Sequence, residues 1–289
     1  MTELQFVLID GTPPREPAAA VSVLERGLHY GEGLFETIAC VAGRPRLLER
    51  HLRRLASGCE RLGLPCDVAA IESEVQELAA GAVRAIVKLL LMRGPAVARG
   101  YALTGREQPV RFALRYSWPD EEPGAAEQGR RVRLAKLRLG ENPALAGIKH
   151  CNRLEQVLAR REWSDPGIGE ALMFSSSGAL VSGTMSNVFL VRGSKLLTPS
   201  VDRCGVAGVM RETVLEIAAQ LGIAIEERRL DGAELAAAEE LFLTNALIGI
   251  RPVRELEGVS LALGPVTRRL QRGLTAHLAA AGETGATGV

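Results

Sequence analysis

The chain has 289 residues and carries 35 Lys and Arg against 34 Asp and Glu, which gives a formal net charge of +1. This near-neutral balance argues against nucleic acid as a main partner, because phosphate binding needs a basic surface. Hydrophobic residues make up 47% of the chain, so a wholly disordered protein is excluded, and the length suits about two domains.

The first half of the chain predicts strands at residues 4–9, 34–41, 84–92 and 110–117. Apolar residues recur at helical spacing from Leu47 to Leu62, and the helix is expected to stop at Gly63. Asp67 is placed to cap a second helix.

Residues 118–129 are polar and rich in chain breakers, which is typical of a linker. We therefore expect a smaller N-terminal α/β domain over residues 1–117 and a larger C-terminal domain over residues 130–289.

The second domain is expected to begin with an alternating strand that ends at Leu139 and leads through turn residues to Lys149. Asn152 and Glu155 have the spacing of a capping box, which predicts a helix directly after the lysine. Its buried face is expected at three apolar positions, Leu154, Val157 and Leu158.

Later elements follow the same rules. Strands are expected at residues 170–174, 187–191 and 240–244, and Asp231 with Glu234 has capping-box spacing for a short helix. A helix opens within the glycine-flanked residues 205–211, and another covers residues 265–281.

Cysteine and histidine spacing points away from a metal site. The five cysteines show no paired spacing and the four histidines are scattered, so we expect no zinc. Reduced thiols, together with an N-terminus that lacks the pattern of a signal peptide, favour a cytoplasmic location. No apolar run approaches the length of a membrane span, so we expect no membrane partner.

Lys149 is the best-placed candidate for chemistry among the chain's four lysines, Lys88, Lys136, Lys149 and Lys195. A helix N-terminus disfavours a nearby ammonium, so a neutral amine is easier to reach there. Such an amine is the nucleophile of Schiff-base chemistry. A solvated surface lysine is the commoner reading of the same pattern.

Two stretches could bind an anion. Residues 205–211 enter a helix with free backbone N–H groups, and the loop at Asn245 and Ala246 could present another. Arg54 lies beside the apolar face of its helix and could turn inward to a phosphate, although the chain holds 31 arginines and a solvated role suits most of them. No hydrolase elbow and no Walker loop is present.

The stretch Leu-Gly-Glu-Asn-Pro-Ala-Leu-Ala-Gly-Ile-Lys-His-Cys-Asn-Arg-Leu-Glu-Gln-Val-Leu-Ala-Arg at residues 139–160 resembles the lysine segment of the aminodeoxychorismate lyase family. These are class IV (fold-type IV) pyridoxal 5'-phosphate enzymes of p-aminobenzoate and folate synthesis. Further motifs resemble that family in order along the chain, at residues 25–37, 51–55, 99–101, 183–189, 205–211 and 245–246.

The resemblance implies a two-domain α/β (α+β) fold with the cofactor between the domains, and a homodimer. Lys149 would bond to pyridoxal 5'-phosphate and act as the catalytic base. The residues that would bind the cofactor are Lys149, Arg54, Ser182, Gly208, Val209, Met210, Asn245 and Ala246. The candidates for the substrate are Arg93, Arg99 and Tyr101, with Tyr30 and His29 nearby.

The implied reaction is a carbon–oxygen lyase reaction that converts 4-amino-4-deoxychorismate to p-aminobenzoate and pyruvate by proton abstraction and elimination. Two alternatives stay open: a class IV aminotransferase acting on a D-amino acid or a branched-chain amino acid, and a non-catalytic relative. Ser182 stands where the family usually has a glutamate that holds the pyridine nitrogen protonated. A neutral hydroxyl favours that protonation far less, which suits elimination better than amino transfer.

Overall fold

A computed structural model describes residues 2–14, 21–119 and 124–283, and these residues pack into two compact units. The first comprises residues 2–14, 21–119, Ile148–Asn152 and Glu283, and the second comprises residues 124–147 and 153–282. Residues 120–123 of the expected linker lie outside the described residues. The domain ranges 1–117 and 130–289 stay a prediction; the packing units differ from them in that Ile148–Asn152 and Glu283 join the first unit.

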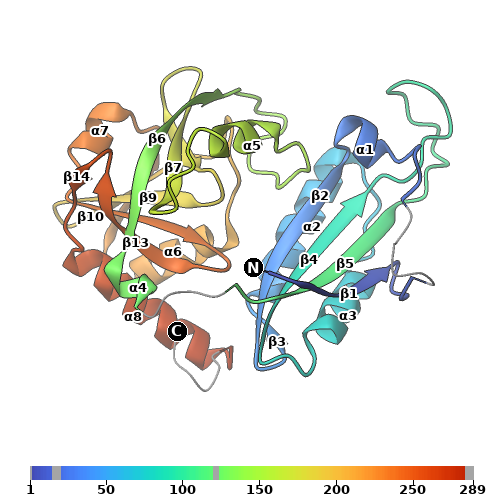
Figure 1. The fold of residues 1–289 in the computed structure, drawn as a ribbon, viewed down its shortest axis with the longest axis horizontal. Helices are drawn as coiled ribbons and strands as arrows, with labels where there is room; N and C mark the ends of the chain where they lie inside the picture. The colour runs from blue at the N-terminus through green and yellow to red at the C-terminus, as the bar shows by residue number, and fades with distance from the viewer. Residues whose placement is uncertain (1, 15–20, 120–123, 284–289) are drawn as a thin grey trace. The chain divides into compact units, whose positions relative to one another are not determined.

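The first unit is built on a five-stranded antiparallel sheet with the strand order β1-β5-β4-β2-β3 (Figure 1). Helices α2 and α3 pack against this sheet and share a core with β2 and β4. Its elements are β1 (Leu4–Ile9), α1 (Arg26–Tyr30), β2 (Gly33–Val41), β3 (Arg44–Pro45), α2 (Leu48–Leu62), α3 (Val68–Ala79), β4 (Arg84–Met92) and β5 (Val110–Ser117).

The second unit contains a nine-stranded mixed sheet with the order β11-β10-β9-β12-β13-β6-β7-β8, in which β14 pairs with β13 (Figure 1). Its strands are β6 (Arg130–Leu139), β7 (Ile168–Ser175), β8 (Leu180–Gly183), β9 (Asn187–Arg192), β10 (Lys195–Pro199), β11 (Ala224–Arg228), β12 (Glu240–Asn245), β13 (Gly249–Leu256) and β14 (Val259–Ser260). Its helices are α4 (Ala125–Gln128), α5 (Leu154–Arg160), α6 (Val209–Gln220), α7 (Gly232–Ala236) and α8 (Pro265–Ala280).

Local sequence signals account for many of these boundaries. Asp67 accepts a hydrogen bond from the backbone N–H of Ala70 at 3.0 Å, which confirms the predicted cap of α3. The capping box of Asp231 and Glu234 is also confirmed at the start of α7. The elements that were not predicted include α1, β8 and β13. The short helix α4 lies within the expected linker.

Two further findings concern the described part of the chain. None of its helices combines the length and the apolar character needed to cross a membrane. None of its clusters of three or more His, Cys, Asp and Glu side chains suits a metal ion.

A buried carboxylate caps α8 from the neighbouring sheet. Glu240 on β12 accepts hydrogen bonds from the backbone N–H groups of Val266 and Thr267, at 3.0 and 2.7 Å, and from the Thr267 hydroxyl at 2.6 Å. The N-cap residue itself is Gly264, where a Cβ would lie only 2.1 Å from the Glu240 carboxylate. The sheet therefore supplies the cap that the helix lacks.

We expect Glu240→Ala to lower the free energy of unfolding by about 2 kcal/mol or more, because it leaves buried helix donors unpaired. Urea unfolding followed by circular dichroism measures the change. Glu239→Ala is the matched control, because Glu239 is exposed and accepts one bond from Gly193, so its effect should stay within about 0.5 kcal/mol. Equal unfolding midpoints for the two variants would contradict the capping role.

Candidate active site

Lys149 lies on a short extended segment that pairs with the start of β2. The backbone N–H of Phe35 donates to the Lys149 carbonyl at 3.1 Å, and Cys151 donates to the Gly33 carbonyl at 2.9 Å. Ile148, directly before the lysine, is buried in the core of the first unit. The lysine is therefore held by backbone pairing to β2, with a buried residue directly before it as its anchor.

The close packing at this anchor depends on a glycine in α2. A Cβ at Gly58 would lie 2.9 Å from the Leu34 side chain and 3.2 Å from the Ile148 side chain. Both distances are shorter than ordinary van der Waals contact, so a larger residue would push the segment off the helix. The amino group of Lys149 lies 4.2 Å from the centre of the Phe35 ring, and Lys88 on β4 lies 5.8 Å from the same ring.

The predicted capping box after Lys149 is wrong. The Asn152 side chain donates to the Gly31 carbonyl at 3.2 Å, and Glu155 accepts from the backbone N–H of Gly140 at 2.7 Å. Helix α5 instead begins at Leu154, after an Arg153 that makes no side-chain cap. The lysine thus precedes the first turn of the helix by several residues, and a helix dipole acts only within about that turn. The dipole argument for a neutral amine is therefore unsupported.

The expected buried face of α5 is also wrong. Leu154, Val157 and Leu158 are exposed, and the residue of α5 that is buried is Ala159. Helix α5 contacts β6 and β7, and Ala159 joins a small core with residues of these strands. The small side chain lets the helix lie close to the sheet, which turns the larger apolar residues outward.

A buried carboxylate on β2 organises the residues beside Lys149. Glu36 is only 1% exposed. It accepts two hydrogen bonds from Arg54, from Nε at 2.8 Å and from Nη2, and it pairs with Nδ1 of His51 at 2.6 Å. Burial alone would raise the pKa of Glu36, but the charge of Arg54 and the hydrogen bonds from Arg54 and His51 lower it to about 2.

His51 is held neutral in this arrangement. Burial lowers its pKa most strongly, and Glu36 opposes that shift, while the positive charges of Arg54 and Lys149 lower the pKa further. Its Nε2 is buried and meets no hydrogen-bond partner among the described residues. An unpaired buried nitrogen of this kind is uncommon in folded proteins, and a bound ligand is one group that would pair with it.

The second unit contains the two backbone stretches expected to bind an anion, residues 205–211 and Asn245 with Ala246, whereas Arg54 lies on α2 of the first unit. Gly208 is the N-cap of α6 and provides no side-chain cap. A Cβ on Gly208 would lie 2.0 Å from the side-chain oxygen of Asn187, whose amide donates to the Val206 carbonyl at 2.9 Å. The glycine therefore lets the start of α6 approach β9 closely. The N–H groups of Val209 and Met210 begin this helix.

Asn245 is the last residue of β12 and Ala246 follows it, next to β9, since Thr244 pairs with Asn187. The Asn245 side chain donates to the Met185 carbonyl at 3.2 Å and accepts from the backbone N–H groups of Leu247 and Ile248 at 2.9 and 3.0 Å. Ser182 lies on β8 and is buried, and its hydroxyl donates to the Gly183 carbonyl at 2.8 Å.

Three of the expected substrate residues come together in the first unit. The Tyr30 ring lies 5.7 Å from His29 and 5.1 Å from Tyr101, centre to centre. Tyr101 is 82% exposed, and Arg99 is exposed on the same loop.

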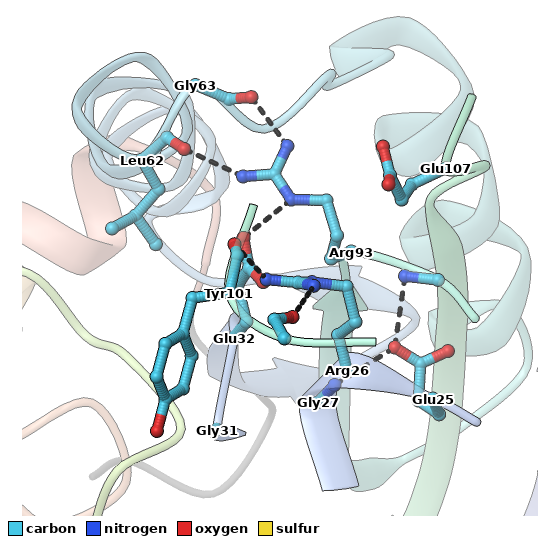
Figure 2. Close-up of polar contacts among 12 residues, drawn as sticks. Glu25, Arg26, Gly27, Gly31, Glu32, Leu62, Gly63, Arg93, Tyr101 and Glu107 are labelled. Atoms are coloured by element: carbon cyan, nitrogen blue, oxygen red, sulfur yellow. Dashed lines mark hydrogen bonds and ion pairs between the residues drawn. The ribbon is translucent and has the colours of Figure 1, made fainter. Parts of the chain in front are cut away.

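Arg93 is arranged differently from the others. Its guanidinium is buried and donates to Glu32 at 2.8 Å and to the carbonyls of Gly63 and Leu62 at 2.6 and 2.7 Å (Figure 2). In this structure the fork therefore holds the C-terminus of α2, and it does not face outward toward a substrate.

Sequence reasoning did not single out Glu36 or His51. A charged residue in the otherwise apolar strand β2 was the available signal, because a carboxylate in such a position must be paired. His51 and Arg54 were the natural partners, since residues three apart share one face of a helix.

The comparisons with known proteins agree on the family to which the chain is similar. The chain matches the family profile described as amino-transferase class IV over residues 33–256. It is 31% identical over 268 residues to an aminodeoxychorismate lyase of Vibrio harveyi, covering 89% of this chain and 97% of that protein. The crystal structure of 4-amino-4-deoxychorismate lyase from Pseudomonas aeruginosa matches with a TM-score of 0.89 at 45% identity, covering 94% of this chain and 99% of that chain.

A third match concerns the fold. The crystal structure of a branched-chain amino acid aminotransferase of Escherichia coli matches with a TM-score of 0.82 at 24% identity, covering 93% of this chain and 93% of that chain. At this identity the match speaks for the fold alone. Together with the lyase structure it confirms the predicted α/β fold class.

The buried ion pair predicts a pH dependence. Because the pKa of Glu36 is about 2 in the folded chain against an ordinary 4.5, its stabilising contribution is complete above pH 4.5 and is lost as the pH falls toward 2. The lowered pKa of His51 has the same sign, with the loss starting below its ordinary value of 6.5.

We expect Glu36→Gln to reduce the free energy of unfolding at pH 7 by about 3 kcal/mol, because Arg54 loses its buried counter-charge. The loss of stability between pH 4.5 and pH 2 should be smaller than in the unmodified chain. Urea unfolding at several pH values tests both statements. Glu49→Gln on the exposed side of α2 serves as the control and should leave the pH dependence unchanged. A parallel pH dependence for Glu36→Gln would count against the assignment.

Proposed function

The chain belongs to the class IV aminotransferase family, and on that premise we propose that it is a lyase that converts 4-amino-4-deoxychorismate to p-aminobenzoate and pyruvate. The similarity to the Pseudomonas aeruginosa lyase, 45% identity over 94% of this chain, carries the proposal. The segment that bears Lys149 and the residues around it supply the chemistry that such a reaction needs.

The proposed cofactor is pyridoxal 5'-phosphate, and the described residues fit it. Lys149 lies against an aromatic ring, and the buried Nε2 of His51 meets no partner among the described residues. Gly208 leaves the start of α6 without a side-chain cap, so this helix end suits a phosphate. When bound, pyridoxal 5'-phosphate supplies an electron sink for the charge that proton loss leaves on the substrate carbon.

Each proposed contact to the cofactor has a distinct part. Lys149 holds it through the amino group. The backbone N–H groups of Val209 and Met210 bind the phosphate, and Asn245 with Ala246 closes the same anion site. Arg54 was expected at the phosphate as well, but in this structure its guanidinium pairs with Glu36. Ser182 would offer the ring nitrogen a hydroxyl in place of a carboxylate; in this structure that hydroxyl donates to the Gly183 carbonyl.

Lys149 also moves the proton in the proposed reaction. Its amine removes the proton from C4 of the substrate as a general base. The electron pair of that C–H bond forms a ring double bond while the bond between C3 and the ether oxygen breaks. The ring becomes aromatic, and the departing enolpyruvate takes up a proton at its methylene carbon to become pyruvate.

The substrate carries two carboxylates, and the exposed loop at Arg99 and Tyr101 is the proposed place for them. Arginine binds carboxylates with two parallel hydrogen bonds, and the Tyr101 hydroxyl can donate a third. Tyr30 and His29 lie beside Tyr101 and complete the group. Arg93 is left out of this proposal because its fork is bound to Glu32 and to the end of α2.

The alternative is amino transfer by the same lysine on a D-amino acid or a branched-chain amino acid. Ser182 is the observation that separates the two reactions. Amino transfer benefits from a protonated ring nitrogen, which a serine hydroxyl does not enforce. Elimination draws on aromatisation, so it depends less on a deep electron sink. We also propose a homodimer and a cytoplasmic location, on the resemblance to the family.

The direct test is incubation of the purified chain with 4-amino-4-deoxychorismate while p-aminobenzoate and pyruvate are measured. We expect Lys149→Ala to abolish product formation, the visible absorption of the bound cofactor and borohydride trapping at position 149. Lys88→Ala is the matched control, because Lys88 lies near the same Phe35 ring and should keep all three. A colourless chain that releases no product would instead support a non-catalytic relative.

The second test concerns the choice of reaction. Ser182→Glu should raise amino transfer to a keto acid relative to p-aminobenzoate release, because a carboxylate would hold the ring nitrogen protonated. Ser182→Gln introduces a neutral side chain of the same size as glutamate, so it separates the effect of the charge from the effect of the larger side chain. The ratio of the two products measures the effect, and an unchanged ratio in Ser182→Glu would remove the explanation based on the ring nitrogen.

A further inference from the structure

Glu32 lies between two buried arginines in the connection from α1 to β2 (Figure 2). One carboxylate oxygen accepts from Nε of Arg26 at 2.6 Å, and the other accepts from Nε of Arg93 at 2.8 Å. Buried charges are stable in a protein when they are paired and fully hydrogen-bonded, and here both guanidinium groups have further acceptors.

The two arginines reach different parts of the first unit. Arg93 donates to the carbonyl of Leu62, the last residue of α2, and to that of its C-cap Gly63. Helix α2 also carries Arg54 and His51. Arg26 donates to the carbonyls of Gly100 and Tyr101, at 3.1 and 2.9 Å. Glu32 therefore joins the end of α2 to the loop that bears Arg99 and Tyr101.

The backbone on either side of Glu32 holds the Lys149 segment. The Gly31 carbonyl accepts from the Asn152 side chain at 3.2 Å, and the Gly33 carbonyl accepts from the Cys151 N–H at 2.9 Å. A Cβ at Gly31 would lie 2.3 Å from the Asn152 side-chain oxygen, so a larger residue would displace the side chain that binds the Gly31 carbonyl. The carboxylate that binds the two arginines thus sits on the same few residues that pair with the lysine segment.

The loop itself has a defined shape. Gly100, between Arg99 and Tyr101, has a φ of 98°, a conformation that favours glycine. Where the loop begins, Gly94 has a φ of 95° and donates to the carboxylate of Glu25 at 3.0 Å. Arg26 also lies 4.9 Å above the Tyr30 ring, which contacts the Tyr101 ring.

We propose that Arg26, fixed by Glu32, is a positioning residue that sets the Arg99–Tyr101 turn relative to the Lys149 segment and so tunes the enzyme for a substrate with carboxylates. The inference rests on the function proposed above for the same loop. Arg26 does not touch the substrate; it acts by holding two carbonyls that flank the side chains of the turn. Its fork suits this task, because three nitrogens of one planar group bind Glu32 and both carbonyls.

Arg26→Lys keeps the charge next to Glu32 but cannot reach all three acceptors. We expect its KM for 4-amino-4-deoxychorismate to rise about tenfold while kcat stays within about twofold, because weaker binding affects the ground state and the transition state alike. Arg111→Lys is the matched control. Arg111 pairs through its side chain with the buried Glu74 at 2.8 Å and with Asp10, not with the carbonyls of Gly100 and Tyr101, so the variant should keep KM unchanged. A fall in kcat with an unchanged KM, or an equal rise of KM in the control, would overturn the proposal.

A second readout needs no activity. Trypsin can cleave the chain after Arg99, and the rate of cleavage at this bond reports how often the turn loses its native conformation. We expect Arg26→Gln to raise this rate about tenfold, since the bonds to Gly100 and Tyr101 are lost, while Arg111→Gln leaves it unchanged. An unchanged cleavage rate in Arg26→Gln would refute the positioning role even in an active enzyme. Faster cleavage in a chain whose unmodified form releases no p-aminobenzoate would instead refute the proposed reaction and leave the positioning of the turn standing.

Discussion

The pairing of Glu36 with Arg54 and His51 is the interaction on which the first half of the candidate site depends. A carboxylate with almost no exposure cannot remain charged in an apolar strand unless cations and donors meet it. Both partners lie on one face of α2, so the ion pair fixes the rotation of that helix on the sheet. The same rotation places Gly58 against Leu34 and Ile148, and the Lys149 segment can then lie beside β2.

The fold was readable from the sequence where burial follows a simple period. The strands β1, β4 and β5 alternate or run apolar between clear breakers, and their predicted limits hold. Helix α1 was not predicted, because its five residues are too few to show a periodic pattern. It depends on tertiary contacts of the buried Arg26. Strand β13 was not predicted, because Arg251 and Pro252 interrupt its apolar run, although both residues are buried. A local pattern cannot report a residue whose partners are distant in the chain.

The candidate site also contains residues that the sequence identified and contacts that only the structure revealed. Resemblance to a family singled out Lys149, and the structure supplies what spacing could not, namely the backbone pairing and the aromatic ring that meet it. Capping-box spacing misled because Asn152 and Glu155 found acceptors and donors outside the helix. Arg93 looked like a loop residue near a glycine, but its guanidinium binds the end of a helix. Arginine roles in a chain this rich in arginine are decided by three-dimensional neighbours.

The course of the chain around Lys149 has one more consequence. The five residues Ile148–Asn152 pack with the first unit, while the residues before and after them belong to the second. A fragment that ended near residue 118 would lack the strand that satisfies Gly33 and Phe35 and covers Leu34. The first half of the chain is therefore not a self-sufficient module that could be inherited or recombined without the lysine segment. Any exchange of parts between relatives has to carry the lysine segment together with the sheet it pairs with, which ties the evolution of the two halves to one another.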